Sequence, residues 1–65
     1  MKTIATIELD NEEGRGELYW ADGSIHCRRV EDGEEWDTEQ RCEEEEAEDT
    51  IKALYAGSVW GLEWV

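Results

Sequence analysis

Basic residues are scarce in this chain of 65 residues. It contains six lysines and arginines against 19 aspartates and glutamates, so its formal net charge at pH 7 is −13. A charge of this size opposes binding to nucleic acid and to anionic lipid, because both carry negative charge themselves. We therefore expect neither nucleic acid nor a membrane as a partner. A basic protein is the partner that this charge favours.

Cysteine and histidine are also few. The two cysteines, Cys27 and Cys42, are too few for a disulfide framework. Together with the single histidine, His26, they do not supply four closely spaced zinc ligands. His26 and Cys27 are neighbours in an expected strand, so their side chains point to opposite faces and cannot form a nucleophile–base pair. We expect no enzyme, no metal site and no cofactor.

Long apolar runs are missing as well. No stretch approaches the ~20 apolar residues that span a bilayer, and the first residues lack the apolar core of a secretory signal. We therefore expect a protein of the cytoplasm that forms a single domain over residues 1–65. The chain has no proline and no internal repeat, but it has four tryptophans and two tyrosines. Because each large aromatic residue buries much area, we expect a folded domain rather than a disordered chain.

The first half of the chain predicts three strands. Residues 2–9 form the first, with Ala5, Ile7 and Leu9 on one face, and residues 10–14 form a loop. Residues 15–21 and 24–30 form a hairpin around a type I′ turn at Asp22-Gly23. A two-residue loop pairs Ala21 with Ser24, Trp20 with Ile25, Tyr19 with His26, Leu18 with Cys27 and Glu17 with Arg28. This register brings the apolar residues to one face and opposes one pair of unlike charges.

The second half predicts a helix and a last strand. Asp32-Gly33 forms a turn, and Asp37 or Thr38 can cap a helix over about 38–56, with Gln40 completing a capping box. The apolar stripe of this helix is Ala47, Ile51, Leu54 and Tyr55, and Gly57 ends it. Residues 58–65 alternate as a strand, parallel to the third or the first. The expected fold is α+β, a two-layer β-β-β-α-β domain whose mostly antiparallel, four-stranded sheet carries one helix on one face.

Nearly all of the excess charge lies between residues 31 and 49. This segment has twelve acidic residues and one base, Arg41, which gives a net charge of −11. We call its acidic residues the acidic block, and we predict that they bind the partner. They are Glu31, Asp32, Glu34, Glu35, Asp37, Glu39, Glu43, Glu44, Glu45, Glu46, Glu48 and Asp49.

The acidic block differs from an ordinary solvated helix face, which would mix Glu with Lys. On the expected helix, Glu39/Glu43, Glu44/Glu48 and Glu45/Asp49 are like-charge pairs that each cost about 0.2–0.5 kcal/mol. Glu43 and Glu44 also fall on the expected apolar stripe. A cost to stability favours a functional role, and a row of carboxylates can approximate the phosphates of one DNA strand. The sequence therefore predicts a DNA-mimic inhibitor. An acidic adaptor for some other basic protein remains the alternative.

As a whole, the chain resembles the small acidic anti-CRISPR proteins of phages and mobile elements, and those acting on type I-C systems in particular. The resemblance is carried by the chain length, the opening MKTIATIELD, the block EEWDTEQRCEEEEAED and the ending VWGLEWV. It implies a Cas subunit as partner, on the basic surface where a type I Cascade effector binds the target duplex and its PAM. Other phage DNA mimics inhibit restriction enzymes or uracil glycosylase, and such targets stay open. We expect a monomer, although Trp60, Leu62 and Trp64 could either pack on the helix or pair two protomers.

Overall fold

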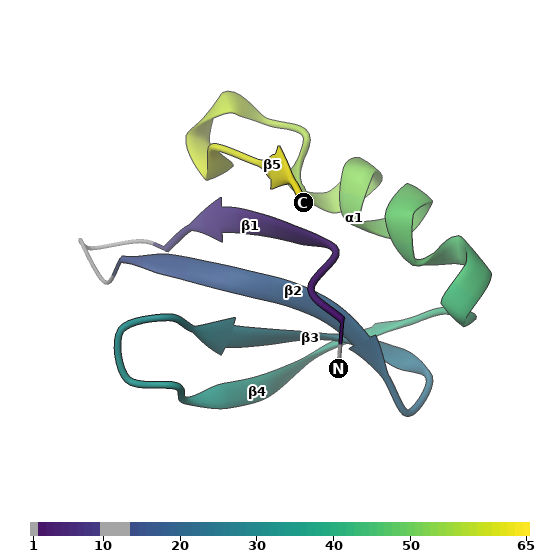
Figure 1. Ribbon diagram of the computed structural model, residues 1–65. Helices are drawn as coiled ribbons and strands as arrows, with labels where there is room; N and C mark the ends of the chain where they lie inside the picture. Colours follow the sequence, from purple (N-terminus) through teal and green to yellow (C-terminus); the bar gives the residue numbers. More distant parts are fainter. Residues whose placement is uncertain (1, 10–13) are drawn as a thin grey trace.

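The fold is a small α+β domain in which one helical segment packs against an antiparallel sheet (Figure 1). The computed structural model describes residues 2–9 and 14–65. Its five strands lie in the order β4-β3-β2-β1-β5, and every neighbouring pair is antiparallel. The predicted fold class and the helix on one face are therefore confirmed, but the sheet has five strands rather than four. Most of the expected loop at 10–14 lies outside the described residues.

The first three strands follow the prediction closely. They are β1 (Ala5–Glu8), β2 (Arg15–Ala21) and β3 (Ser24–Arg29). All five predicted pairs of the β2–β3 hairpin are present. Asp22 and Gly23 have φ values of 51° and 82°, as a type I′ turn requires at both central positions. Alternation and turn chemistry agree here, so a register slip would expose the buried face of both strands.

The predicted helix start at residue 38 is wrong, because residues 35–41 form a fourth strand, β4 (Glu35–Arg41), beside β3. Trp36 pairs with Cys27 and packs against the core, while Asp37 is exposed on the other face. Thr38 Oγ1 donates to the carbonyl of Ile25 at 2.6 Å. A strand buries the Trp36 ring, whereas a helix would have placed mostly polar residues toward the sheet.

The capping chemistry expected at Asp37 and Thr38 exists, but it serves a bulge. Asp37 Oδ1 accepts from the amide of Glu39 at 2.6 Å, and Thr38 Oγ1 accepts from that of Gln40 at 3.3 Å. Glu39 has a φ of 67°, and the β3–β4 register shifts at this point. A side-chain oxygen that bonds an amide two residues ahead can begin a helix or shape a turn. The same local signal therefore fits both structures.

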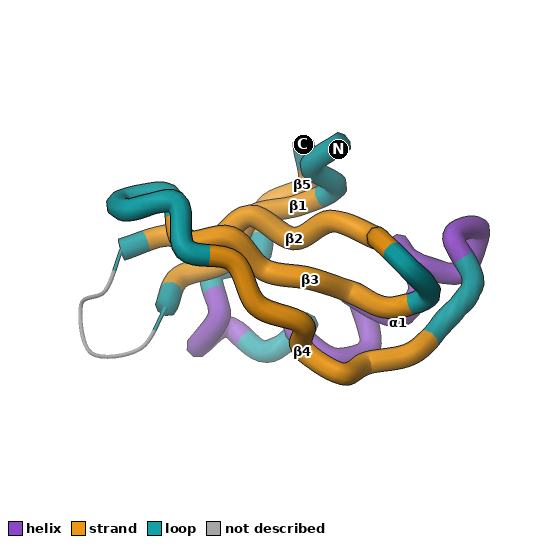
Figure 2. Tube along the Cα trace, turned by 90° about the horizontal axis from the view of Figure 1, so that it is seen from below, coloured by secondary structure: helices purple, strands orange, loops and turns teal. Residues whose placement is uncertain are grey.

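The helical segment begins six residues later than predicted. It consists of the 3₁₀ turn η2 (Glu44–Glu46) and the helix α1 (Ala47–Tyr55). From the predicted stripe, Ala47 and Ile51 are buried and Tyr55 is half-buried, but Leu54 is exposed. The expectation that Glu43 and Glu44 face the core is wrong, because both precede α1 and are exposed. Figure 2 shows the helical segment on one side of the sheet.

The end of the chain forms a short strand rather than a long one. The 3₁₀ turn η3 (Ser58–Trp60) comes first, and the two-residue strand β5 (Glu63–Trp64) follows. Gly61, with a φ of 56°, interrupts the expected alternation. The strand β5 is antiparallel to β1, so the predicted parallel pairing is wrong. After α1 the chain turns back at η3 and runs beside β1 in the opposite direction (Figure 1).

A small apolar core lies between the sheet and α1. Its fully enclosed residues come from β1, β2, β3 and the helical segment: Ala5, Ile7, Leu18, Ile25, Cys27, Ala47 and Ile51. Trp60 and Leu62 are partly buried against this core, and Trp60 meets Tyr55 edge-on at 5.0 Å between ring centroids. Among the described residues, no helix has the length and apolar character to cross a membrane.

Candidate functional site

All twelve members of the acidic block are exposed. Three lie in the turn after β3, three on β4, four from the end of the β4–η2 connection through η2, and two in the first turn of α1. They therefore follow the chain along one edge of the sheet and then onto the helix, as Figure 1 lets the reader trace. The predicted site residues form a continuous path, in which Glu35, Asp37 and Glu39 lie on a strand instead of the predicted turn and first helical residues.

The acids of the turn are partly neutralised by Arg29. Its Nη1 lies 3.1 Å from Asp32 Oδ2, and its Nη2 lies 3.6 Å from Glu34 Oε1. The guanidinium also lies 5.7 Å from the centre of the Trp36 ring, within the range of a cation–π contact. Sequence reasoning missed this role of Arg29, although the spacing Arg29–Asp32 was visible. The Asp32 and Glu34 carboxylates are therefore held in place, and Arg29 compensates part of their negative charge.

Glu35 is bound, through Tyr19, to the bare face of the sheet, by which we mean the face that points away from α1. The Tyr19 hydroxyl donates to the Glu35 carboxylate, and the Tyr19 ring stacks on His26 with 5.4 Å between centroids. Burial, together with this carboxylate, raises the pKa of Tyr19 to about 12. The hydroxyl is therefore protonated at neutral pH and remains a donor. It orients the Glu35 side chain on β4.

Asp37 accepts two hydrogen bonds, and both hold its carboxylate in the ionised form. The Glu39 amide donates to it at 2.6 Å and the Ser24 hydroxyl at 3.0 Å. These bonds, the backbone bond first, lower the pKa of Asp37 below its ordinary value, although partial burial acts against them. Asp37 is therefore a fixed negative charge at the middle of β4.

Ser24, His26 and Asp37 lie together but do not form a catalytic triad. His26 Nε2 is 3.0 Å from the carbonyl of Ala21, so this nitrogen carries a proton that it donates. It is also 3.2 Å from Ser24 Oγ, whose own proton goes to Asp37. A triad needs the histidine between the serine and the carboxylate, with a free nitrogen as base. Ser24 is completely buried, so this cluster joins β3 to β4 and offers no nucleophile.

Glu43 and Glu46 are used by the helix itself. The backbone amide of Glu43 donates to Glu46 Oε1 at 3.2 Å, within a capping box. The capping box thus exists six residues after the place predicted for it. It is built from glutamates instead of Asp37 and Gln40, and it satisfies a backbone donor at the start of the helical segment.

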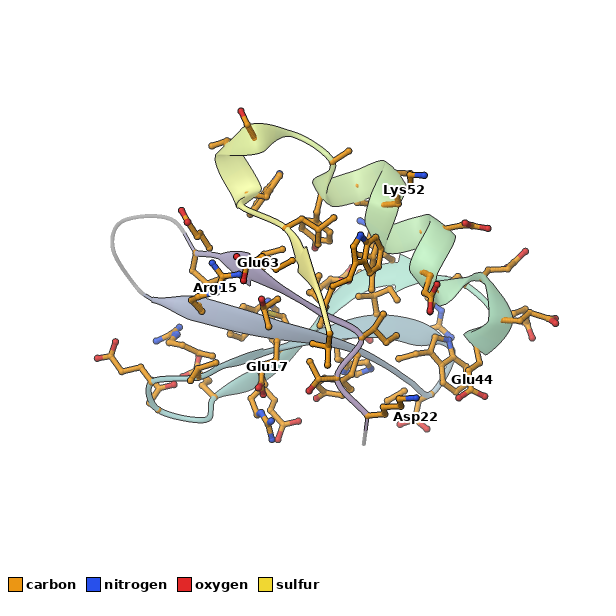
Figure 3. The ribbon with its side chains drawn as sticks, turned by 45° about the horizontal axis from the view of Figure 1, so that its top comes forward. Arg15, Glu17, Asp22, Glu44, Lys52 and Glu63 are labelled. Atoms are coloured by element: carbon orange, nitrogen blue, oxygen red, sulfur yellow. The ribbon has the colours of Figure 1, made fainter. Side chains whose placement is uncertain are left out.

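Four acids of the helical segment are not used in this way. Their carboxylates have no hydrogen bond or ion pair in the described part of the chain, where they project from the first two helical turns: Glu44, Glu45, Glu48 and Asp49. Figure 3 shows Glu44 at the start of this segment and Lys52 farther along it. Carboxylates near a helix N-terminus are favoured by the helix dipole. Their charge is directed to solvent and is the most available in the block.

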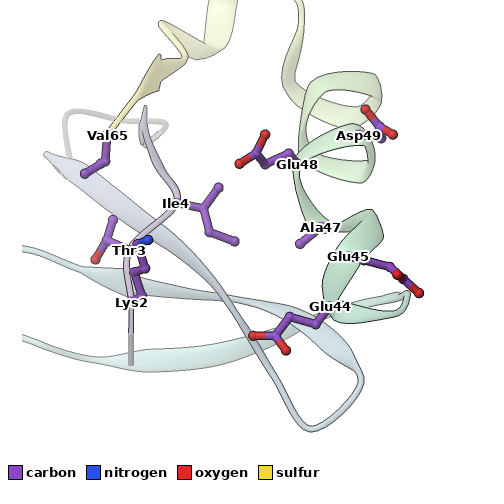
Figure 4. Close-up of a pocket in the computed structure, with 9 residues that line it drawn as sticks. All are labelled: Lys2, Thr3, Ile4, Glu44, Glu45, Ala47, Glu48, Asp49 and Val65. Carbon is purple, nitrogen blue, oxygen red and sulfur yellow. The ribbon is translucent and has the colours of Figure 1, made fainter.

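A groove lies beside these acids. It has a volume of about 470 Å³, and its opposite side is formed by Lys2, Thr3, Ile4 and Val65. Figure 4 shows Glu44 and Glu48 directed into the groove, while Glu45 and Asp49 point away from it on the other side of the helical segment. Sequence reasoning could not find the groove, because residues 2–4 and Val65 come from the two ends of the described chain and no local pattern links them to the helical segment.

Five other charged residues pair with one another on the face of the sheet that points away from α1. Arg28 binds Glu17, and Arg15 lies 3.7 Å from Glu8 and 3.6 Å from Glu63. Figure 3 shows Arg15 and Glu63 side by side. These pairs leave little uncompensated charge, so the bare face contrasts with the helical segment.

The described residues bring no three His, Cys, Asp or Glu side chains together in an arrangement that could hold a metal ion. Cys27 is a buried free thiol, and burial raises its pKa to about 11. Cys42 is a half-buried free thiol that precedes the helix. Cys27 is therefore not poised for chemistry as a thiolate at neutral pH. The surface that stands out is therefore the acidic one.

Comparison of the chain with protein-family models, curated proteins and solved structures found no match.

Proposed function

We propose that this protein is a DNA-mimic inhibitor that binds the basic DNA- and PAM-binding surface of a type I CRISPR-Cas (Cascade) effector and blocks target DNA binding. One observation carries the proposal: all twelve acids of the block are exposed along one continuous path over β4 and the helical segment. The protein acts as a monomer in the bacterial cytoplasm. It needs no cofactor and catalyses no reaction.

The spacing of the carboxylates supports mimicry of a backbone rather than of bases. Side chains on one face of a strand repeat every ~6.6 Å, and neighbours on a helix are ~5–6 Å apart. One DNA strand carries a charge per ~3.4 Å. A single row of carboxylates therefore reaches about half the charge density of one DNA strand. The second row on the helix, which includes Glu45 and Asp49, brings the density closer to that of DNA.

The fixed acids and the free acids have different uses in this proposal. Asp37 and Glu35 are held by Ser24 and Tyr19 before any partner arrives, so they lose little side-chain entropy on binding. Glu44 and Glu48 are free to adapt to lysines and arginines of the partner. Charge of one sign over the whole path also accelerates association with a basic groove.

The experiment is a competition on a purified type I-C Cascade effector with its target duplex. The protein and the duplex should exclude each other, and the affinity for the protein should fall steeply between 0.05 and about 0.3 M salt because the contacts are screened. A variant in which Glu44, Glu45, Glu48 and Asp49 become the corresponding amides should bind more weakly. The matched control is Asp22→Asn, an exposed acid in the hairpin turn outside the block.

A ternary complex that holds both the duplex and the protein at full affinity would refute the mimic. A different outcome is that the protein fails to bind this effector and excludes DNA, in a salt-sensitive way, from a restriction enzyme or a DNA glycosylase. That result would support an acidic inhibitor but would refute Cascade as its target.

A further inference from the structure

An amphipathic groove runs between the helical segment and the residues that flank β1 and β5, which are residues 2–4 before β1 and Val65 after β5. Its apolar part is formed by Ile4 and Val65, with Ala47 opposite them (Figure 4). A second hollow of about 330 Å³ adjoins it at Glu48 and is also lined by Asp49, Lys52 and Trp64. Val65 is 80% exposed and Trp64 is 48% exposed. Apolar surface of this kind, next to a concave site, is typical of an interaction surface.

The charge around the groove has one predominant sign. Glu44 and Glu48 point into it, and Glu45 and Asp49 line it but point away from it. Among the described residues, Lys2 is the one base that lines the larger hollow, and Lys52 lines the smaller one. The four acids outnumber these two lysines, so the local charge is negative and a cationic side chain is the one that fits there.

We propose that this groove is the docking site for a basic amphipathic segment of the partner protein, with apolar side chains over Ile4, Trp64 and Val65 and arginine or lysine against Glu44 and Glu48. The proposal rests on the proposed function for the basic character of the partner. It adds that apolar contacts, and not carboxylates alone, provide part of the affinity. An arginine can also stack on the exposed Trp64 indole while its fork meets a carboxylate.

The acidic wall disfavours the other occupants. A second copy of the chain would bring Glu44 and Glu48 of both copies toward each other in a two-fold contact, since such an interface matches a patch with itself. Anionic lipid would be repelled by the same carboxylates. A basic protein segment is the occupant that satisfies both the apolar and the charged side of the groove.

The test uses the whole protein and two synthetic octapeptides of equal charge, one alternating Arg and Leu and one alternating Arg and Ser. Binding is followed by two-dimensional NMR of the ¹⁵N-labelled protein. The Arg/Leu peptide should bind about tenfold more tightly, because each leucine buries apolar area. Its shift changes should centre on Ile4, Ala47, Val65 and the indole N–H of Trp64.

Two charge variants with the same net charge locate the site. Glu44→Gln with Glu48→Gln should weaken the Arg/Leu peptide about fivefold, since two charge contacts are lost. The matched control is Glu31→Gln with Glu39→Gln, in which both exposed acids lie away from the groove. The control should change the affinity less than twofold.

Two apolar variants test the other side of the groove. Trp64→Ala should abolish the preference for leucine over serine. If the loss of this β5 residue unfolds the chain, Val65→Ser provides the same test at an exposed position and should reduce the preference about threefold.

Equal affinity for both peptides, equal weakening by both charge variants, or shift changes centred on β4 would each overturn the proposal. So would self-association in sedimentation that buries Trp64. None of these measurements contains a Cascade effector or DNA, so the groove can fail while the exclusion of DNA stands, and the reverse.

Discussion

The carboxylate of Asp37 on β4 accepts a hydrogen bond from the hydroxyl of Ser24 on β3, and the two oxygens are 3.0 Å apart. This bond joins the edge strand of the sheet to its neighbour at the point where the register shifts. The acid therefore has two roles, as a member of the exposed block and as a tie between strands. Its protonation state links the acidic surface to the stability of the fold.

The first prediction concerns the stability at acid pH. The pKa of Asp37 is lowered in the folded protein, so its contribution to stability is present above its unfolded pKa of ~3.9 and is lost as the pH falls through the folded value. In urea titrations between pH 5 and pH 2, Asp37→Asn should lose less of its unfolding free energy than the wild type. Asp22→Asn serves as the control. Equal losses in Asp37→Asn and the wild type would contradict the prediction.

The second prediction concerns Tyr19 at alkaline pH. Its pKa is raised to about 12 in the folded protein, above its unfolded value near ~10. The stability that it provides is therefore present below pH ~10 and is lost as the pH rises toward 12. Tyr19→Phe should flatten this loss in denaturant titrations, and it should remove the latest-ionising phenol from the absorbance titration at alkaline pH. A steep loss in the variant would contradict the assignment.

The third prediction tests the close packing of β2 on the core. A Cβ added to Gly16 would lie 2.7 Å from Cys27 Sγ and 3.1 Å from Leu9 Cδ2. We expect Gly16→Ala to cost ~1–3 kcal/mol through overpacking, measured by chemical denaturation. The control is Gly57→Ala, where the nearest atom is 3.8 Å away.

A second substitution can show that the contact with sulfur is the cause. Cys27→Ala in the Gly16→Ala background should restore part of the lost stability, because it removes the atom that the new methyl group meets. Additive losses in the double variant would refute this explanation.

The fourth prediction revises what the acidic block costs. Sequence alone suggests that neutralising the run would stabilise a helix strained by like charges. In the structure, Glu44 and Glu48 lie at the start of the helical segment, where the dipole favours each acid by ~0.3–1 kcal/mol. Their mutual repulsion costs only ~0.2–0.5 kcal/mol. Since two dipole contacts are lost and one repulsion is relieved, we expect Glu44→Gln with Glu48→Gln to lower the unfolding free energy by ~0.1–1.8 kcal/mol instead of raising it.

The same variant should bind the Cascade effector more weakly, so thermal unfolding and binding are measured on one preparation. A clear rise in the melting temperature, together with unchanged binding, would show that the two glutamates neither interact favourably with the helix dipole nor contact the partner.

The sequence by itself determined the β2–β3 hairpin and the exposure of the acidic block. Register follows from Asp22-Gly23 and from alternation, because a shift of one residue would turn Leu18 and Ile25 to solvent. Exposure follows from the cost of burying a charge, which is large unless the charge is paired. Both are local or nearly local properties. The predicted hairpin register is confirmed, whereas the expectation that Glu43 and Glu44 face the core is wrong.

Only the tertiary structure decided what β4 and β5 would be. Asp37 and Thr38 can cap a helix or shape a bulge with the same bonds, and the choice depends on whether Trp36 can pack over Cys27, a contact across the sheet. The position of β5 beside β1 likewise depends on how the chain turns back at η3 after α1. The groove between Ile4 and Glu48 exists because these two distant segments meet there. Such contacts depend on the summed packing of the domain, which no short pattern encodes.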